Sequence, residues 1–261
     1  MQIKAKKSLG QNFLIDKNII DKIISVTEIE GKNILEIGPG TGNLTEIITR
    51  KKPNKLFVIE KDSHLCEMLY EKFKTKITIF NEDILKFDLY KFKNDNFSVF
   101  GNLPYNISSK IISKFVINSD MILFDDLIFM FQKEVGDRIL ADVNTSLYGR
   151  LSILLNWRLN IKKICDIKPT SFNPIPKVDS SLIHFTFKKN YFPISNVKNL
   201  ETITRIFFNQ RRKKIKKPFK QIFQNFEQIS NELEIDLNLR PQNLDIKTFC
   251  KITEKYEILI S

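Results

Sequence analysis

The sequence predicts an α/β domain with a mostly parallel sheet, followed by a small helical domain. Short buried strands alternate with helical segments along the first half of the chain, as in a parallel sheet with helices on both faces. From about residue 191 onward only helical patterns remain. We therefore expect one domain over residues 1–190 and a second over residues 191–261.

The first domain is predicted to begin with a helix that Asp16 caps, because Ile19, Ile20, Ile23 and Ile24 form one apolar stripe. The alternation of strands and helices follows it. Further helices are expected near 43–51, 64–73 and 108–117. The expected strands are the short apolar runs NILEI (33–37), KLFVIE (55–60), KITIF (76–80), FSVFG (97–101) and LIFMFQ (127–132).

A late strand, SLIHFTFK (181–188), follows the proline-containing loop 169–176. A late strand after five strand–helix units is expected to insert antiparallel in an otherwise parallel sheet. In the second domain the helical patterns lie around 198–209, 215–234 and 245–259.

The composition excludes several classes of protein. At 42% hydrophobic and 28% charged residues, the chain is typical of a globular protein. It contains no run of ~18 uncharged apolar residues that could span a membrane. The basic start, MQIKAKKSLG, lacks the apolar core of a signal peptide, so we expect a cytoplasmic protein. The three Cys and two His are too widely spaced for a disulfide framework or a metal site.

The excess of positive charge indicates a polyanionic partner. The chain has 42 Lys and Arg against 30 Asp and Glu, a net charge of +12. A Lys-rich composition is an alternative explanation, as is a solvated helix face, but clustering favours nucleic acid. Residues 211–220 hold seven bases and no acid, and Lys4, Lys6 and Lys7 form a second group. The candidate nucleic-acid-binding residues are Arg211, Arg212, Lys213, Lys214, Lys216 and Lys217.

A glycine-rich turn follows the first strand. The segment ILEIGPGTG (34–42) places Gly38, Gly40 and Gly42 between a strand and a helix, where the backbone can approach a ligand closely. Asn43 stands where a dinucleotide-binding motif would need glycine, which argues against NAD or FAD. The segment also lacks the Lys of a P-loop. A plain strand-to-helix turn is the alternative interpretation.

Two acids extend this site. Glu60 ends the second strand, where a carboxylate can accept both ribose hydroxyls, and Asp83 follows the third strand, where it can accept from an adenine amino group. Each alone is typical of a solvated loop. Together with the glycine turn they indicate one adenosine without phosphates, because two carboxylates would repel ATP but suit a sulfonium. The predicted cofactor is S-adenosylmethionine.

The motif Asn-Leu-Pro-Tyr (102–105) follows the fourth strand. It resembles the [NDS]-P-P-[YF] signature of methyltransferases that act on exocyclic amines of bases. The side chain of Asn102 and the carbonyl of Leu103 can accept the two hydrogens of an adenine amine. Pro104 restricts Leu103 to an extended conformation, and Tyr105 offers a ring on which the base can stack. The predicted reaction is a direct methyl transfer that depends on positioning.

Longer blocks make the resemblance specific. From residue 6 to about residue 250 the chain is similar, in order and without a large insertion, to the KsgA family of small-subunit ribosomal RNA adenine dimethyltransferases. The blocks that carry this resemblance are KKSLGQNFL (6–14), FQKEVGDRI (131–139), YGRLS (148–152), FNPIPKVDSS (172–181), FNQRRK (208–213) and RPQNL (240–244).

The resemblance implies a Rossmann-like, S-adenosylmethionine-dependent methyltransferase fold in residues 1–190 and an rRNA-binding domain in residues 191–261. The implied substrate is a pair of adjacent adenosines in the 3′-terminal hairpin loop of 16S rRNA, in an immature small subunit, and we expect a monomer. It also implies that Phe172 stacks on the target adenine opposite Tyr105. The implied cofactor contacts are Asn12, Leu14, Gly38, Glu60, Asp83 and Asn102.

Two alternatives remain open from the sequence. A large-subunit (23S) rRNA adenine methyltransferase of the macrolide-resistance type would share the cofactor turn and the Asn-x-Pro-[YF] motif, although RPQNL and the PKVDSS block favour the small-subunit enzyme. A ribosome-assembly factor that acts mainly by binding is the other alternative. An intact Asn102 and glycine turn argue against a version without catalysis.

Overall fold

A computed structural model of the chain describes residues 5–6, 9–93, 95–119 and 124–260. Lys4 and Lys7 lie outside these residues. Internal contacts divide the chain into two compact units, Met1–Gly136 with Asn160–Phe187 and Asp137–Leu159 with Lys188–Ser261. The segment 137–159, which we expected in the first domain, therefore groups with the C-terminal helices.

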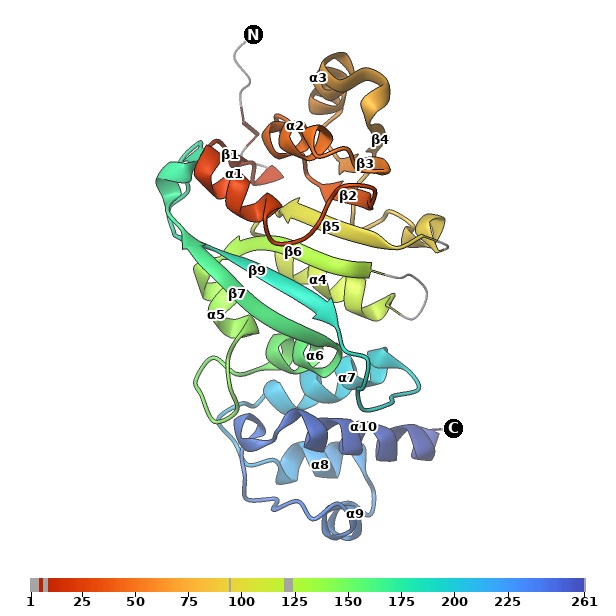
Figure 1. Cartoon of the computed structure of the whole chain (residues 1–261). Coiled ribbons are helices and arrows are strands. Elements are labelled where there is room, and N and C mark those ends of the chain that lie inside the picture. The colour runs from red at the N-terminus through yellow and green to blue at the C-terminus, as the bar shows by residue number, and fades with distance from the viewer. Residues whose placement is uncertain (1–4, 7–8, 94, 120–123, 261) are drawn as a thin grey trace. The chain divides into compact units, whose positions relative to one another are not determined.

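The first unit is built on a seven-stranded sheet with the order β4-β3-β2-β5-β6-β9-β7 (Figure 1). The first five of these strands run parallel, and β9 pairs with β6 in the antiparallel direction. This confirms the predicted fold class and the late antiparallel strand. The strands are β2 (Asn33–Ile37), β3 (Lys55–Glu60), β4 (Thr78–Asn81), β5 (Phe97–Asn102), β6 (Phe124–Gln132), β7 (Leu159–Ile167) and β9 (Ser180–Phe187).

The first four helices of the first unit lie where the sequence predicts them. Asp16 caps α1, because its carboxylate accepts hydrogen bonds from the amides of Asn18 and Ile19. Short 3₁₀ turns lie at Lys74–Lys76, Leu89–Phe92 and Pro169–Ser171. The α-helices are α1 (Lys17–Ile24), α2 (Asn43–Arg50), α3 (Ser63–Phe73) and α4 (Ser108–Ile117), and α5 (Lys133–Ile139) contains the boundary between the units.

The register of the parallel strands brings their carboxyl ends to one edge. Ile37 lies beside Ile59 and Gly101, Glu60 lies beside Asn81, and Asn102 pairs with Met130. The residues that follow these strands therefore meet at that edge, which is where open α/β sheets bind ligands.

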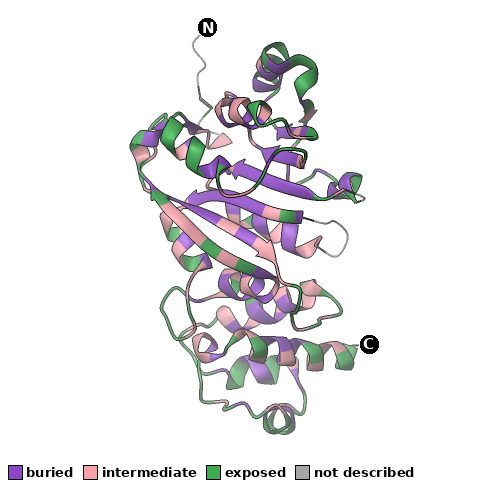
Figure 2. Ribbon diagram, in the orientation of Figure 1, coloured by how far each residue is buried: buried purple, intermediate pink, exposed green. Residues whose placement is uncertain are grey.

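Apolar side chains fill the space between the sheet and its helices. The central strands β5 and β6 are buried for most of their length, whereas the outer faces of the helices are exposed (Figure 2). The core includes Ile34, Val58 and Phe100 from the sheet, and Ile48 and Leu69 from the helices. The central strands are buried at consecutive positions because helices cover both faces of the sheet, which is why they read as continuous apolar runs in the sequence.

A second, smaller sheet of the first unit was not expected. β1 (Phe13–Leu14) pairs antiparallel with β8 (Phe172–Asn173), so that Leu14 lies opposite Phe172. The Ile15 amide also donates to the Ser171 carbonyl at 2.9 Å. These bonds join a segment near the N-terminus to one more than 150 residues later in the sequence.

The second unit is helical. Rings of α7, α8 and α10 form its core, with the Phe207 centroid 5.7 Å from that of Phe219 and 5.5 Å from that of Phe249. The helix expected over 215–234 is two shorter helices, because the chain becomes extended at Phe223. A 3₁₀ turn lies at Pro241–Asn243. The helices are α6 (Arg150–Arg158), α7 (Val197–Phe208), α8 (Lys216–Ile222), α9 (Phe226–Glu232) and α10 (Ile246–Ile260).

Among the described residues, no helix is long and apolar enough to cross a membrane. The same residues hold no group of three or more His, Cys, Asp or Glu side chains arranged to bind a metal ion.

Candidate active site

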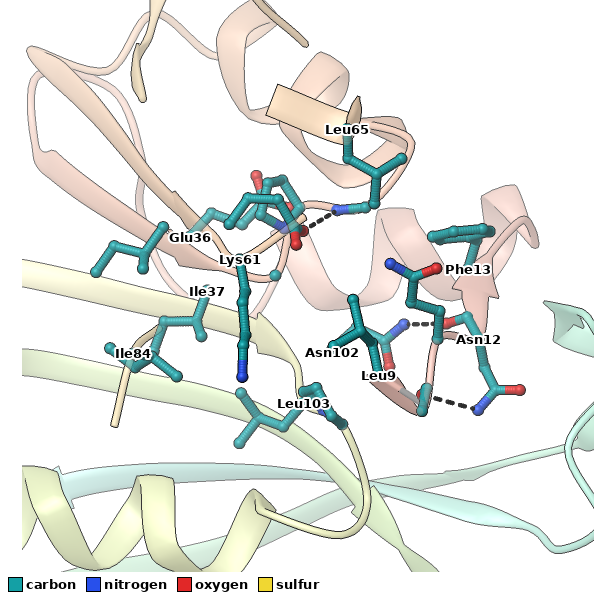
Figure 3. A pocket seen from close by; sticks show the side chains of 18 of the residues that line it. Leu9, Asn12, Phe13, Glu36, Ile37, Lys61, Leu65, Ile84, Asn102 and Leu103 are labelled. Carbon is teal, nitrogen blue, oxygen red and sulfur yellow. Dashed lines mark hydrogen bonds between the residues drawn. The ribbon is translucent and has the colours of Figure 1, made fainter. Parts of the chain in front are cut away.

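A cavity lies at the carboxyl edge of the sheet in the first unit (Figure 3). Its walls come from the loops after β2, β3, β4 and β5 and from the segment 9–14. Of the predicted cofactor and catalytic residues, the cavity brings together Asn12, Leu14, Gly38, Gly40, Glu60, Asp83, Asn102, Leu103, Pro104 and Tyr105.

The cavity is acidic although the chain as a whole is basic. Its lining contains four carboxylates, Glu36, Glu60, Glu82 and Asp83, and one lysine, Lys61. The net charge of the whole chain is +12. Such a lining disfavours a polyphosphate and favours a ligand that carries positive charge.

Two glycines of the turn have different roles. Gly40 has φ +58° and lines the cavity, and a Cβ there would lie 2.7 Å from Cδ1 of Phe13. Only glycine therefore allows the N-terminal segment to approach the turn this closely. Gly42 does not line the cavity. It precedes α2 with φ +77°, and a Cβ there would lie 2.7 Å from the ring of Phe73, so its position reflects packing.

Glu60 is held at the end of β3 by backbone amides. Its carboxylate accepts from the amide of Asp62 at 2.9 Å and, at 3.4 Å, from the amide of Gly40. The side chain is almost fully buried, and burial raises its pKa despite these bonds. A fixed, poorly hydrated carboxylate of this kind is suited to accept hydroxyl hydrogens from a ligand.

Asp83 is fixed in a similar way. Its Oδ1 accepts from the Leu85 amide at 2.9 Å, and its Oδ2 lies 3.0 Å from the Nζ of Lys61. Partial burial alone would raise the pKa of Asp83, but the Leu85 amide and the Lys61 ammonium outweigh it and lower the pKa. Asp83 is therefore ionised at neutral pH and acts as a hydrogen-bond acceptor.

Sequence reasoning missed Glu36 and Lys61, both of which line the cavity. Glu36 is buried within β2 and accepts a hydrogen bond from the Thr45 hydroxyl at 2.6 Å. Burial raises the pKa of Glu36 to about 7. The signal was present in the sequence, because a single acid inside the otherwise apolar run NILEI requires a reason to be there.

The N-terminal segment contacts the catalytic motif directly. The side-chain amide of Asn102 donates to the backbone carbonyl of Asn12 at 2.7 Å (Figure 3). Because the nitrogen of the Asn102 amide is engaged in this way, its oxygen is left as an acceptor. The same segment is anchored from α2, where the Asn43 side chain donates to the Leu14 carbonyl at 2.8 Å.

The rest of the Asn-Leu-Pro-Tyr motif forms a turn at the cavity. The Ile107 amide donates to the Pro104 carbonyl at 3.1 Å, which closes the turn, and the Leu103 side chain is buried. The Tyr105 hydroxyl lies 2.6 Å from Oγ of Ser180, the first residue of β9. Burial raises the pKa of Tyr105, so its hydroxyl stays protonated at neutral pH.

Phe172 is not brought to the cavity. Its side chain is 1% exposed, and it packs in the apolar core of the first unit. The Phe172 ring therefore has no exposed face on which a base could stack, and the predicted stacking stays a prediction. Phe13, which was not among the predicted site residues, does line the cavity.

The basic segment of the second unit lies mostly in the turn between α7 and α8, and its residues have two kinds of environment. Arg211 donates to the Gln242 side chain at 3.2 Å and to the Thr145 carbonyl at 3.1 Å. Lys214 donates to the Asn238 side chain at 2.8 Å, and Lys216 lies 3.6 Å from Glu227. Within the described residues, the following side chains are exposed and have no polar partner: Arg212, Lys213 and Lys217.

The fold and the position of the site define the class of protein. A similar solved structure is a dimethyladenosine transferase from Plasmodium falciparum, with 27% identity and a TM-score of 0.76 over 94% of this chain and 98% of the other. The 23S rRNA methyltransferase ErmE has a TM-score of 0.68 at 20% identity, over 94% of this chain and 100% of the other, a likeness of fold. The first unit therefore has a Rossmann-like methyltransferase fold.

The sequence comparisons are more specific. The family model "Ribosomal RNA adenine dimethylase" matches residues 2–257. "Ribosomal RNA small subunit methyltransferase A" of Pelagibacter ubique is 57% identical over 260 residues, 99% of each chain. The protein of the same name from Ehrlichia ruminantium is 40% identical over 256 residues, 96% of each chain. The chain belongs to the ribosomal RNA adenine dimethylase family, which confirms the resemblance seen in its motifs.

Proposed function

We propose that this protein dimethylates the exocyclic 6-amino groups of two adjacent adenosines in the 3′-terminal hairpin loop of 16S rRNA, using S-adenosylmethionine. The observation that carries the proposal is the Asn102 amide, which the Asn12 carbonyl fixes beside an acidic cavity. Membership of the family supports the reaction. The names of the relatives, which specify the small subunit, support the choice of rRNA.

The residues of the cavity fit S-adenosylmethionine. Glu60 would accept the ribose hydroxyls and Asp83 would accept from the adenine amino group. The methionine portion would lie against the backbone of the turn at Gly38 and Gly40, and all four residues line the cavity. The carboxylates of the lining suit a cation. When bound, the cofactor supplies a methyl group that is activated by its attachment to a positively charged sulfur.

The Asn-Leu-Pro-Tyr motif would hold the target base. An adenine amine is a weak nucleophile because its lone pair is delocalised into the ring. The oxygen of Asn102 and the Leu103 carbonyl are proposed to accept its two hydrogens and so to direct the lone pair toward the methyl group. Tyr105 would stack on the ring, with its hydroxyl anchored to Ser180.

We further propose that the second unit binds the rRNA backbone. Arg212, Lys213 and Lys217 are exposed and can pair with phosphates, whereas Arg211 is engaged within the unit. The target adenosine has to leave its stack to reach Asn102, which costs less in an unpaired loop than in a duplex. We expect the protein to act as a monomer in the cytoplasm, on an immature small subunit.

The experiment that tests this function compares two substrates. The protein is incubated with S-adenosylmethionine and either small-subunit particles or large-subunit rRNA, both without methylated adenines, and the nucleosides are measured by mass spectrometry. We expect dimethyladenosine in the small-subunit sample alone. Its appearance in large-subunit RNA alone would instead identify an enzyme of the macrolide-resistance type. No product in either sample, with particles still bound, would favour the assembly-factor alternative.

A further inference from the structure

Lys114 makes an unusual set of contacts in the first unit. It lies on α4, and its ammonium donates to three backbone carbonyls, those of Ile84 at 2.8 Å, Leu85 at 3.1 Å and Phe87 at 2.5 Å. The side chain is half-buried, and burial lowers its pKa. A partly desolvated ammonium is costly unless its donors are satisfied, and here backbone oxygens satisfy them.

The loop that these carbonyls belong to forms one wall of the cavity. Residues 82–85 line it, and Asp83 is the acid assigned to the adenine amino group. Residues 82–87 form neither helix nor strand. Within the described part of the chain, no backbone amide donates to the carbonyls of Ile84, Leu85 or Phe87. Lys114 therefore satisfies three carbonyls of this loop, while the amides of Lys86 and Phe87 close it locally by donating to the Asp83 carbonyl.

Lys114 also connects two parts of the site. The helix α4 begins at Ser108, three residues after Tyr105, so the helix that follows the catalytic motif also holds the loop after β4. Contacts within the loop, such as the Leu85 amide to Asp83, set the local geometry of the carboxylate. These contacts lie within the loop, whereas Lys114 joins its backbone to α4 and Lys61 joins the Asp83 side chain to the end of β3.

We propose that Lys114 is a positioning residue for the cofactor: its ammonium fixes the loop 83–87 so that Asp83, Ile84 and Leu85 meet the adenine ring. The inference rests on the proposed function, because it needs an adenosine in this cavity. Lys114 itself does not line the cavity and acts through the loop. Its loss is expected to weaken the binding of the adenosine portion of the cofactor.

The test uses the full chain with Lys114→Met, which keeps much of the apolar stem but removes the donors, and Lys114→Gln, which keeps two donors on a shorter side chain. Lys110→Met, an exposed lysine one turn earlier on α4, is the matched control. Calorimetry gives the Kd for S-adenosylhomocysteine and for 5′-methylthioadenosine, which lacks the amino-acid portion, well below each melting temperature.

We expect Lys114→Met to weaken both ligands by the same factor, about ten- to hundredfold, since several charge-assisted hydrogen bonds are lost. The affinity for both ligands is expected to fall less in Lys114→Gln and to stay unchanged in Lys110→Met. In methylation assays the KM for S-adenosylmethionine should rise more than kcat falls. The variant that combines Asp83→Asn with Lys114→Met should raise the Kd by less than the product of the two single factors, because both changes act through one loop.

A lower melting temperature with unchanged Kd for both ligands would overturn the inference, since Lys114 would then serve only stability. If Lys114→Met does not fold, unchanged affinity in Lys114→Gln overturns it equally. Failure of the unmodified chain to bind S-adenosylhomocysteine would overturn the proposed function, and this inference with it. If the unmodified chain binds S-adenosylhomocysteine and the Lys114 variants bind it equally well, the inference fails while the proposed function stands.

Discussion

The cavity and the basic segment hold their polar side chains in opposite ways. At the cavity, Asn102, Glu60 and Asp83 each have a partner within the protein that fixes their direction. In the basic segment, Arg212 and Lys213 extend into solvent. A reaction on one amine requires a fixed geometry, whereas a phosphate backbone can be bound by charges that adjust to it. The predictions below test whether this difference corresponds to two separate functions.

The largest effect is expected from Asn102→Ala. It removes the acceptor for the target amine, so kcat should fall by about 10²–10³-fold or more. Because the basic segment is unchanged, rRNA binding should remain. Rates are measured with labelled S-adenosylmethionine and binding by filter retention, with the exposed Asn160→Ala as the control. Loss of rRNA binding in Asn102→Ala would contradict the separation of roles.

A combined change of Arg212, Lys213 and Lys217 to Ala should weaken rRNA binding and leave the catalytic site intact. We expect rRNA affinity to weaken by about ten- to hundredfold, and the slope of log affinity against log salt to become shallower by about 2–3. Melting temperature and S-adenosylhomocysteine binding should not change. Arg211→Ala is the contrasting variant: it leaves the Gln242 and Thr145 contacts unmade, and should reduce the free energy of unfolding by about 1–3 kcal/mol.

The buried Glu36 makes the cavity region sensitive to pH. Because burial raises its pKa from 4.5 to about 7, the folded chain binds this proton more tightly than the unfolded chain does. Its stabilising contribution is complete below the unfolded-state pKa and is lost as pH rises through about 7. Relative to Glu36→Gln, the parent chain should therefore lose roughly 2–3 kcal/mol of unfolding free energy between pH ~4 and ~8.

Urea unfolding at several pH values measures this difference, with Glu30→Gln as the control at an exposed carboxylate. A parent and a Glu36→Gln variant whose stabilities run parallel with pH would show that Glu36 does not carry a raised pKa.

The smallest effect is expected from the contact between Tyr105 and Ser180. Tyr105→Phe keeps the ring but removes the hydrogen bond, so kcat/KM for rRNA should fall by about three- to tenfold. Ser180→Ala removes the same bond from the other side. The double variant should resemble either single variant, because both changes break one interaction. Fully additive effects would show that the hydroxyl does not orient the ring.

The residues that meet at the carboxyl edge of the sheet were predictable because the strands can be recognised from local apolar patterns. Apolar runs identify the strands, and parallel strands place the residues that follow them at one edge, so Gly38, Glu60 and Asn102 meet as expected. The strand β7 was missed because its sequence, LNIKKICDI, carries charges and lacks a clear apolar run. The helices α5 and α6 were missed because their short segments have no long periodic pattern.

A motif can identify a residue in the sequence, but the surroundings of its side chain were less predictable. A motif identifies Phe172, but whether its ring faces the cavity or the core depends on the pairing of Leu14 with it, which no local pattern reveals. Arg211 and Arg212 are adjacent and chemically identical, yet of the two only the Arg211 side chain has polar partners among the residues that the structure describes, Gln242 and Thr145, which are distant in sequence. Such distinctions arise from tertiary packing.

The pairing of β1 with β8 also constrains the order in which the protein can be assembled during synthesis. The N-terminal wall of the cavity leaves the ribosome before its partners at Ser171 and Phe172, which lie more than 150 residues later in the chain. Until then, the contacts of Leu14 and Ile15 with that segment cannot form. A nascent chain that ended before residue 173 would carry the glycine turn, Glu60 and Asn102. It would lack the complete strand β8, which pairs with β1 in the N-terminal wall of the cavity.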